Sequence, residues 1–212
     1  MSTRGRFITL EGGEGSGKST QIRLLAAALA QRGVEVVSTR EPGGSPGAEA
    51  IRDLLVRGDT NRWDPVTEAL LHFAARRDHL RVTVRPALDR GAWVVSDRYA
   101  DSSLVYQGWG MGVDRASLDA LFQIATDGLK PDLTLVLDVP VEIGLARAGL
   151  RPGGEDRYER MGEALHRRLR EGYLAIAAAE PERCVVIDAG GSVDAVSDAV
   201  RAAVDAKFGT AP

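Results

Sequence analysis

The sequence predicts an α/β fold in which a five-stranded parallel sheet lies between two layers of helices. Five short apolar segments alternate with stretches of helical apolar spacing, a pattern typical of a parallel sheet covered on both faces. A glycine-rich turn joins the first of these strands to the first helix. The 212 residues are 44% hydrophobic and 27% charged, which is ordinary globular composition with enough chain for a sizeable core.

The spacing of apolar residues predicts each element. Strands are expected at residues 7–10, 34–39, 93–97, 133–138 and 184–188. Helices are expected at residues 18–32, 48–57, 65–88, 114–127, 156–180 and 193–208, with another beginning near residue 141. Gly33 is a plausible stop for the first helix, and the longest helix is expected to bend near Pro86 because proline lacks a backbone N–H donor.

No repeat, low-complexity tract or long linker divides the chain, so residues 1–212 are predicted to form a single domain. A Pro/Gly break at residues 149–154 is flanked by arginines. Glycines at both ends of a short break are what a lid over a site needs. The sequence therefore predicts a short lid at about residues 147–157.

Composition excludes several classes of protein. No apolar run reaches the roughly 18 residues of a transmembrane helix, and the N-terminus is unlike a signal peptide, so a cytoplasmic protein without membrane partners is expected. The net charge of −3 argues against a nucleic-acid-binding surface. Cys184 is the only cysteine, so an internal disulfide and a cysteine-built zinc site are excluded.

The turn after the first strand fits the phosphate-binding pattern G-x-x-x-x-G-K-[ST] without a gap. Glycines let backbone N–H groups surround a phosphate, and the following helix adds the positive end of its dipole. The alternative is a glycine-rich turn with an incidental lysine, but the strand before and the helix after favour the motif. It predicts ATP bound with Mg²⁺ by the following residues: Gly12, Gly13, Glu14, Gly15, Ser16, Gly17, Lys18, Ser19 and Thr20. Lys18 would reach the outer phosphates, and the Ser19 hydroxyl would ligate the metal.

The length and the remaining loops favour a small-molecule kinase over a GTPase switch. No N/T-K-x-D loop for reading guanine is present. Polar segments follow the predicted strands, and in open parallel sheets ligands bind beyond the carboxyl ends of the strands. These segments contain Glu41 after the second strand, and Asp97 and Arg98 after the third.

The motifs E-G-G-E-G-S-G-K-S-T, T-R-E-P-G-G, F-A-A-R, D-R-Y and Y-Q-G stand in this order along the chain. The set closely resembles bacterial thymidylate kinase, a P-loop nucleoside monophosphate kinase, over essentially the whole chain. The resemblance implies transfer of the ATP γ-phosphate to dTMP, giving dTDP for dTTP biosynthesis, by a homodimer packed through helices. Another nucleoside monophosphate kinase and a nucleotide-dependent switch are the alternatives.

The resemblance also implies roles for individual residues. It places Phe73 and Arg76 on the thymine base, Arg52 and Arg98 on the acceptor phosphate, and Tyr106 against the sugar 2′ position. Gln107, Ser102 and Ser103 complete the acceptor pocket, and Glu41 and Asp97 lie near the metal and the acceptor phosphate. From the residues alone, Phe73 would be core and Arg52 solvated, and a structural pairing with Asp97 is the alternative role of Arg98.

Catalysis of phosphoryl transfer needs positive charge on the transferring group. The variable loop positions 13–16 are not basic, so the charge is expected from the predicted lid. At least one of Arg147, Arg151 and Arg157 would be delivered to the phosphate. Arg151 is the expected finger because it lies inside the break, and Arg147 is expected instead to pack on adenine beside residues 189–191.

Overall fold

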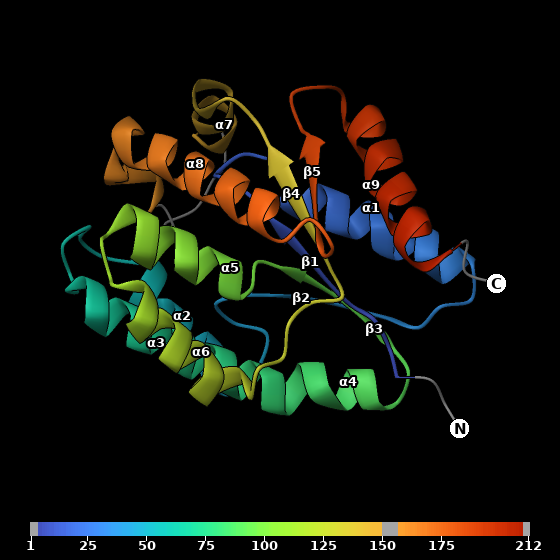
Figure 1. Cartoon of the computed structure of the whole chain (residues 1–212), viewed down its shortest axis with the longest axis horizontal. Coiled ribbons are helices and arrows are strands. Elements are labelled where there is room, and N and C mark those ends of the chain that lie inside the picture. The colour runs from blue at the N-terminus through green and yellow to red at the C-terminus, as the bar shows by residue number, and fades with distance from the viewer. Residues whose placement is uncertain (1–3, 150–156, 210–212) are drawn as a thin grey trace.

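The computed structural model of the chain describes residues 4–149 and 157–209. Its strands form one parallel sheet in the order β2-β3-β1-β4-β5, which confirms the predicted α/β fold (Figure 1). The strands are β1 (Phe7–Glu11), β2 (Val36–Arg40), β3 (Trp93–Asp97), β4 (Leu133–Asp138) and β5 (Cys184–Asp188). Each lies within two residues of the segment predicted from apolar spacing.

The α-helices among the described residues are α1 (Lys18–Gln31), α2 (Pro46–Val56), α3 (Pro65–His79), α4 (Arg85–Asp89), α5 (Ala100–Ser103), α6 (Arg115–Thr126), α7 (Val141–Ala148), α8 (Glu163–Ala179) and α9 (Val193–Phe208). Two π-helical segments, η1 (Leu80–Val84) and η2 (Leu104–Gly110), and the 3₁₀ turn η3 (Glu159–Met161) complete them. The long helix predicted to reach residue 88 is therefore three segments. Pro86 explains the change, because it cannot donate the helical hydrogen bond of its position.

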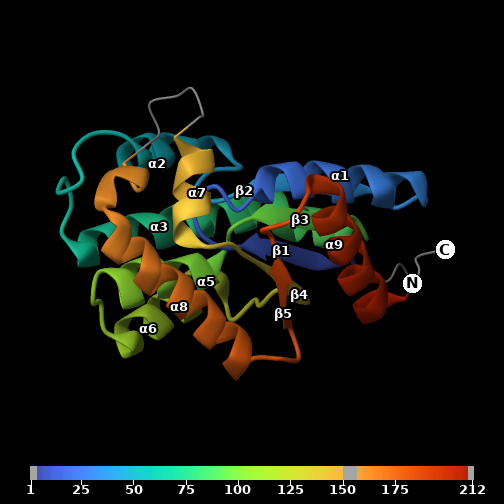
Figure 2. The same ribbon diagram turned by 90° about the horizontal axis from the view of Figure 1, so that it is seen from above.

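Helices cover both faces of the sheet, as Figures 1 and 2 show. On one face, α1 and α9 pack against Ile8, Leu10 and Leu135 of the central strands. On the other, α4 packs against Phe7 and Val94, and α8 with η2 packs on β4. The five residues of β1 are all buried, as expected for a central strand of a parallel sheet covered by helices on both faces.

The strand register brings the polar strand ends together. Leu10 of β1 and Arg40 of β2 both pair with Asp97 of β3, so three strands end at the same edge of the sheet. The phosphate-binding motif follows β1 at this edge, and α2, α3 and α7 lie beyond it (Figure 2). This is where ligands of open parallel sheets bind.

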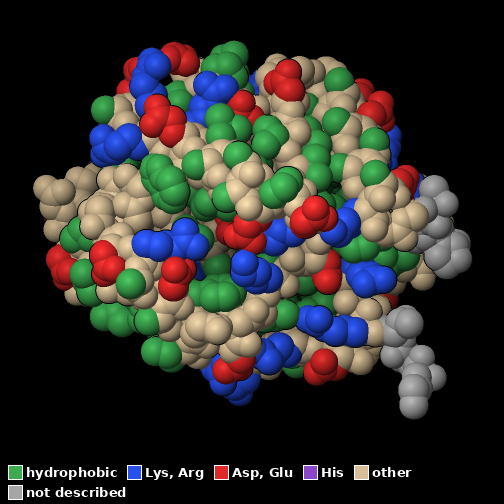
Figure 3. Space-filling model, viewed as in Figure 1, with side chains coloured by type: hydrophobic (Ala, Val, Ile, Leu, Met, Phe, Trp, Pro, Cys, Tyr) green, Lys and Arg blue, Asp and Glu red, His purple; other side chains and the backbone are tan. Residues whose placement is uncertain are grey.

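The surface carries both signs of charge. On the face drawn in Figure 3, basic and acidic side chains are interspersed rather than gathered into one region of a single sign. Over residues 4–149 and 157–209, none of the helices is long and apolar enough to span a membrane.

Candidate active site

The phosphate-binding turn, here called the phosphate loop (residues 12–19), is shaped by its backbone. Gly12, Gly15 and Gly17 have φ angles of 135°, 67° and 90°, a region that other residues adopt only with strain. A Cβ atom added at Gly15 would lie 1.9 Å from the carbonyl oxygen of Gly144 in α7. The loop is thus pressed directly against another backbone. It leads into α1, whose N-terminal N–H groups favour an anion.

Lys18 is folded back onto the loop. Its Nζ atom donates to the carbonyl oxygens of Gly12 and Gly13 at 3.1 and 2.9 Å, and to Ser16 Oγ at 3.3 Å. Burial, and then the neighbouring Arg98, lower the pKa of Lys18 to about 8. The three oxygens that accept hydrogen bonds from Lys18 are all neutral. A phosphate anion would bind the ammonium group more strongly than they do.

Ser19 and Asp97 supply the oxygen atoms that fit a magnesium ion. The Ser19 hydroxyl donates to Asp97 Oδ2 at 2.9 Å, at the start of α1 and the end of β3. Mg²⁺ prefers such hard oxygen ligands, and usually keeps water and substrate phosphates for the rest of its shell. In the part of the chain that the structure describes, no cluster of three or more acidic, histidine or cysteine side chains forms a larger metal site.

Arg98 joins the phosphate loop to the rest of the site. Its guanidinium donates to Gly12 O at 3.0 Å, to Glu14 Oε1 at 2.7 Å and to Tyr106 Oη at 3.0 Å. It also donates to Ser102 Oγ and Tyr173 Oη, at 3.2 and 2.9 Å. Its φ of 71° is unusual for a residue other than glycine. This conformation turns a large cation inward at the strand end, and such strain is concentrated at functional sites.

Two glutamates flank the start of the loop in opposite electrostatic surroundings. Glu11 is buried near Asp101, and burial and this neighbouring carboxylate raise its pKa to about 7. Glu14 is only partly buried. Desolvation acts to raise its pKa, but the guanidinium of Arg98 and the ammonium of Lys18 overcome this effect and lower the pKa to about 2. At neutral pH, Glu14 is therefore an anion that faces the two cations of the site.

A second buried cluster lies on α3. Arg76 donates through Nε to Glu41 Oε2 at 2.7 Å, and through Nη1 to Ser103 Oγ at 3.1 Å. Its guanidinium carbon lies 4.6 Å from the centre of the Phe73 ring, a cation–π contact. His79 contacts the other oxygen of Glu41 at 3.0 Å. Although burial acts against it, the charge of Arg76 lowers the pKa of Glu41, so this carboxylate is an anion.

Comparison with known proteins identifies the family. The family model for Thymidylate kinase matches residues 10–200. The chain belongs to the thymidylate kinase family. It is 56% identical to the thymidylate kinase of Caulobacter vibrioides over 207 residues, which cover 98% of this chain and 99% of that protein. The thymidylate kinase of Nitrobacter winogradskyi is 53% identical, with 96% of this chain and 89% of that protein covered. A crystal structure of the thymidylate kinase from Ehrlichia chaffeensis superposes with a TM-score of 0.78 at 34% identity, over 95% and 99% of the two chains.

The structure brings residues of the motifs that carried the resemblance into two clusters. The structure connects Glu14, Lys18, Arg98, Ser102 and Tyr106 around the phosphate loop. It connects Glu41, Phe73, Arg76 and Ser103 beside α3. Arg52 donates to the carbonyl oxygen of Pro42, the residue that follows Glu41, at 2.7 Å.

The three arginines expected of the lid have different surroundings. Arg147 donates to the carbonyl oxygens of Ala189 and Gly190, at 2.9 and 3.3 Å, which places it at the expected adenine loop. Arg157 is 1% exposed and pairs with Glu68 at 2.6 Å, while it also donates to three backbone carbonyls before α3. Arg157 is therefore fixed in the structure and is a poor candidate for the transferring phosphate. Arg151 lies outside the described residues, as does most of the predicted lid.

Several residues that contact these clusters were not found from the sequence. Glu68, His72 and His79 lie on the inward side of α3, and Tyr173 of α8 reaches Arg98. The one available signal was the spacing of Glu68, His72 and Arg76, which puts all three on one face of a helix. Gly144 gave no local signal, because its role depends on the approach of a loop 130 residues away.

Proposed function

We propose how the thymidylate kinase reaction is divided among the residues of this site. As a thymidylate kinase, the chain phosphorylates dTMP to dTDP. ATP is the phosphate donor. The observation that carries the proposal is the set of hydrogen bonds made by Arg98. Its guanidinium binds both the phosphate loop and the side chains of Ser102 and Tyr106, so it lies between the donor and acceptor sides.

On the donor side, the amides of the phosphate loop and the N-terminus of α1 bind the ATP phosphates. Lys18 leaves the carbonyl oxygens of Gly12 and Gly13 for the phosphates, because an anion is a stronger partner than a neutral oxygen. Ser19 and Asp97 hold Mg²⁺, which when bound neutralises charge on the phosphates. Arg147 supports the adenine side through Ala189 and Gly190.

On the acceptor side, the phosphate of dTMP takes the place of Glu14 as the partner of Arg98, with Arg52 as its second cation. A phosphate monoester has a second pKa near 6, so at pH 7 it is already mostly a dianion. Such a nucleophile needs no strong general base, which suits an acceptor phosphate bound by the cations Arg98 and Arg52. Phe73, Arg76, Ser102, Ser103 and Gln107 bind the nucleoside, and the ring of Tyr106 blocks a 2′-hydroxyl.

Three expectations from the sequence remain part of this proposal. Residues 1–212 form one domain with a lid at 147–157, and Arg151 is the lid residue that stabilises the transferring phosphate. The enzyme acts in the cytoplasm. It is a homodimer packed through helices, and exposed apolar side chains on α3 and α6 support this: Val66, Leu70 and Ile124 are 53%, 51% and 74% exposed.

A coupled assay of ADP formation tests the function. The acceptors dTMP, dUMP, UMP, CMP, AMP and GMP are offered singly with ATP and Mg²⁺. We expect the highest kcat/KM for dTMP and almost no turnover without an acceptor. Faster turnover of CMP or AMP than of dTMP would reject dTMP as the preferred acceptor. ADP formation at the same rate with and without an acceptor would reject kinase activity.

A further inference from the structure

Glu68 of α3 is a buried junction between the acceptor side and the residues that follow the predicted lid. It is 0% exposed. Its Oε1 accepts from Gln107 Nε2 at 2.9 Å and from the Tyr158 hydroxyl at 3.0 Å. Its Oε2 pairs with the Arg157 guanidinium at 2.6 Å. Nothing assigned so far to the thymidylate kinase reaction uses this carboxylate.

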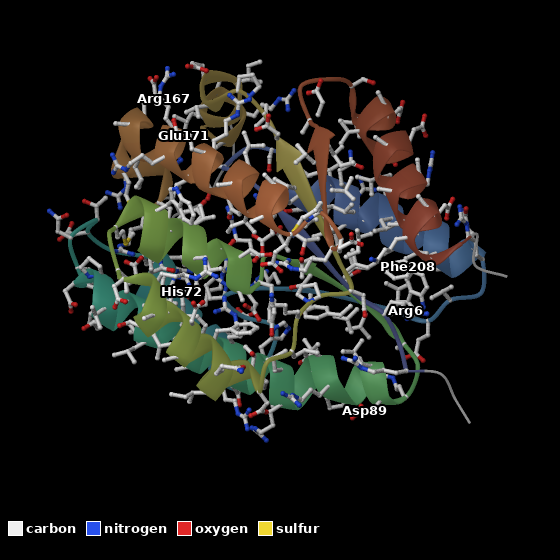
Figure 4. The ribbon with its side chains drawn as sticks, in the orientation of Figure 1. Arg6, His72, Asp89, Arg167, Glu171 and Phe208 are labelled. Atoms are coloured by element: carbon white, nitrogen blue, oxygen red, sulfur yellow. The ribbon has the colours of Figure 1, made fainter. Side chains whose placement is uncertain are left out.

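The donors around Glu68 fix how its neighbours are oriented. The single Tyr158 proton goes to Glu68, so His72 Nε2, 2.8 Å from the Tyr158 oxygen, must donate to it. The Nε2 atom of His72, labelled in Figure 4, therefore carries a proton. Burial and nearby Arg76 lower the pKa of His72 to about 3, so the ring is neutral and this is its only N–H. Every polar atom that faces the Glu68 carboxylate from these partners is a donor.

The same reasoning fixes the side-chain amide of Gln107. Opposite the Arg157 cation, Glu68 is a carboxylate and can only accept hydrogen bonds. Gln107 must therefore present its NH₂ group to Glu68, and its carbonyl oxygen Oε1 faces the other way. Gln107 is 1% exposed, and Oε1 has no hydrogen-bond partner within residues 4–149 and 157–209.

A buried acceptor without a partner is costly unless a ligand supplies a donor. Gln107 follows Tyr106, whose hydroxyl belongs to the Arg98 cluster, and Phe73 lies on the same helix as Glu68. The acceptor dTMP carries two donors of the required kind, the N3–H of thymine and the 3′-hydroxyl of deoxyribose. Free rotation of the amide would let Gln107 offer NH₂ instead, and this would reverse the preference.

We propose that Glu68 is a positioning residue that fixes the amide of Gln107, so that the buried Gln107 Oε1 accepts an N–H or O–H from the acceptor nucleoside. The inference rests on the acceptor pocket proposed above. It makes Glu68 a determinant of acceptor specificity that touches no substrate.

The test compares binding of dTMP with two analogues, 3′-deoxy-dTMP without the 3′-hydroxyl and N3-methyl-dTMP without the N3–H. Affinities are measured by calorimetry for the wild type, Gln107→Met and Glu68→Gln. We expect the wild type to bind one analogue about 10-fold more weakly than dTMP, and Gln107→Met to lose this discrimination. The analogue that discriminates identifies the donor.

Glu68→Gln should lose the same discrimination, because two facing amides can reverse together, while the KM for ATP stays unchanged. Tyr158→Phe is the matched control, since it removes a donor from Glu68 but keeps the carboxylate and its bond to Gln107. It should discriminate like the wild type. If Glu68→Gln does not fold without the counter-ion of Arg157, Gln107→Met still decides whether Oε1 meets the nucleoside.

Equal binding of dTMP and both analogues by the wild type would overturn the inference, as would full discrimination in Glu68→Gln. Either result leaves the proposed function intact as long as dTMP is still phosphorylated. Failure of the wild type to phosphorylate dTMP would instead reject the proposed function, so the two failures are separable.

Discussion

The donor and acceptor sides of this site are held in place by different interactions. The phosphate loop on the donor side is fixed by its backbone, through glycines at positive φ and a direct contact with Gly144. The acceptor side is held by buried charges, where Glu41 pairs with Arg76 and Glu68 pairs with Arg157. All four of these side chains are at most 4% exposed.

This difference affects how each side tolerates change. Backbone geometry fails when a side chain is added, whereas a buried ion pair fails when one partner is removed and the other is left uncompensated. Breaking a buried pair costs about 3–5 kcal/mol, although the intact pair contributes much less. The donor side should therefore be sensitive to gain of atoms, and the acceptor side to loss of charge.

The largest effect is expected from Lys18→Ala, which removes the loop cation that we propose turns to the ATP phosphates. Loss of a preorganised charge of this kind lowers kcat by about 10²–10³-fold. Single-turnover kinetics at saturating ATP and dTMP measure it. Lys130→Ala is the control, since Lys130 is 56% exposed and pairs only with Glu180 among the described residues. A normal rate for Lys18→Ala would end the phosphate-loop assignment.

Arg98→Ala should weaken the binding of dTMP far more than the binding of ATP. The acceptor phosphate loses a charged hydrogen-bond donor, and the charge of Glu14 is no longer neutralised by Arg98. We expect a loss of about 2–3 kcal/mol, or roughly 30-fold to 150-fold in the Kd for dTMP. Calorimetry with each nucleotide separates the two sides. Arg115→Ala, an exposed arginine paired with Asp119, is the matched control. An unchanged Kd for dTMP would contradict the acceptor role.

The same contrast explains what the sequence could predict. The strands and the phosphate loop were predictable because apolar spacing and glycine pattern are local. The acceptor side was predictable only through its resemblance to a family, because on their own Phe73 looks like a core residue and Arg52 like a solvated one. Glu68 and Tyr173 were missed because their partners Gln107 and Arg98 come from distant segments. Residues 100–110 were not assigned to a helix because Ser102, Gly108 and Gly110 interrupt any apolar period.

Gly15→Ala tests the backbone side. The new methyl group would meet the Gly144 carbonyl and force a φ of 67° on alanine, so α7 and the loop must separate. We expect a loss of about 2 kcal/mol in the free energy of unfolding. Gly13→Ala is the control within the same loop, because its Cβ would have no atom within 4 Å. Urea unfolding curves that coincide for the two variants would contradict the close contact.

The smallest expected effect is a pH dependence of stability that differs between the two glutamates at the start of the loop. The pKa of Glu11 is raised from 4.5 to about 7, so the folded protein holds this proton more tightly than the unfolded chain. Its contribution to stability is complete below pH 4.5 and is lost as the pH rises to 7. The pKa of Glu14 is lowered to about 2, so its contribution is present above pH 4.5 and is lost as the pH falls towards 2. The pH range over which the Glu11 contribution is lost, 4.5 to 7, therefore does not overlap the range for Glu14, 4.5 to 2.

Glu11→Gln isolates the stability change caused by titration of Glu11, because it removes the titrating group and keeps its hydrogen bonds. The amide oxygen can still accept from the Tyr99 N–H, and the Ser102 hydroxyl can turn to accept from the NH₂ group. Comparing the variant with the wild type at each pH cancels other titrating groups, such as His72. We expect the wild type to lose roughly 1–2 kcal/mol relative to Glu11→Gln between pH 5 and 8. Urea unfolding at unit pH intervals measures this, with the exposed Glu142→Gln as control. Curves that stay parallel across this range would contradict a Glu11 pKa raised to about 7.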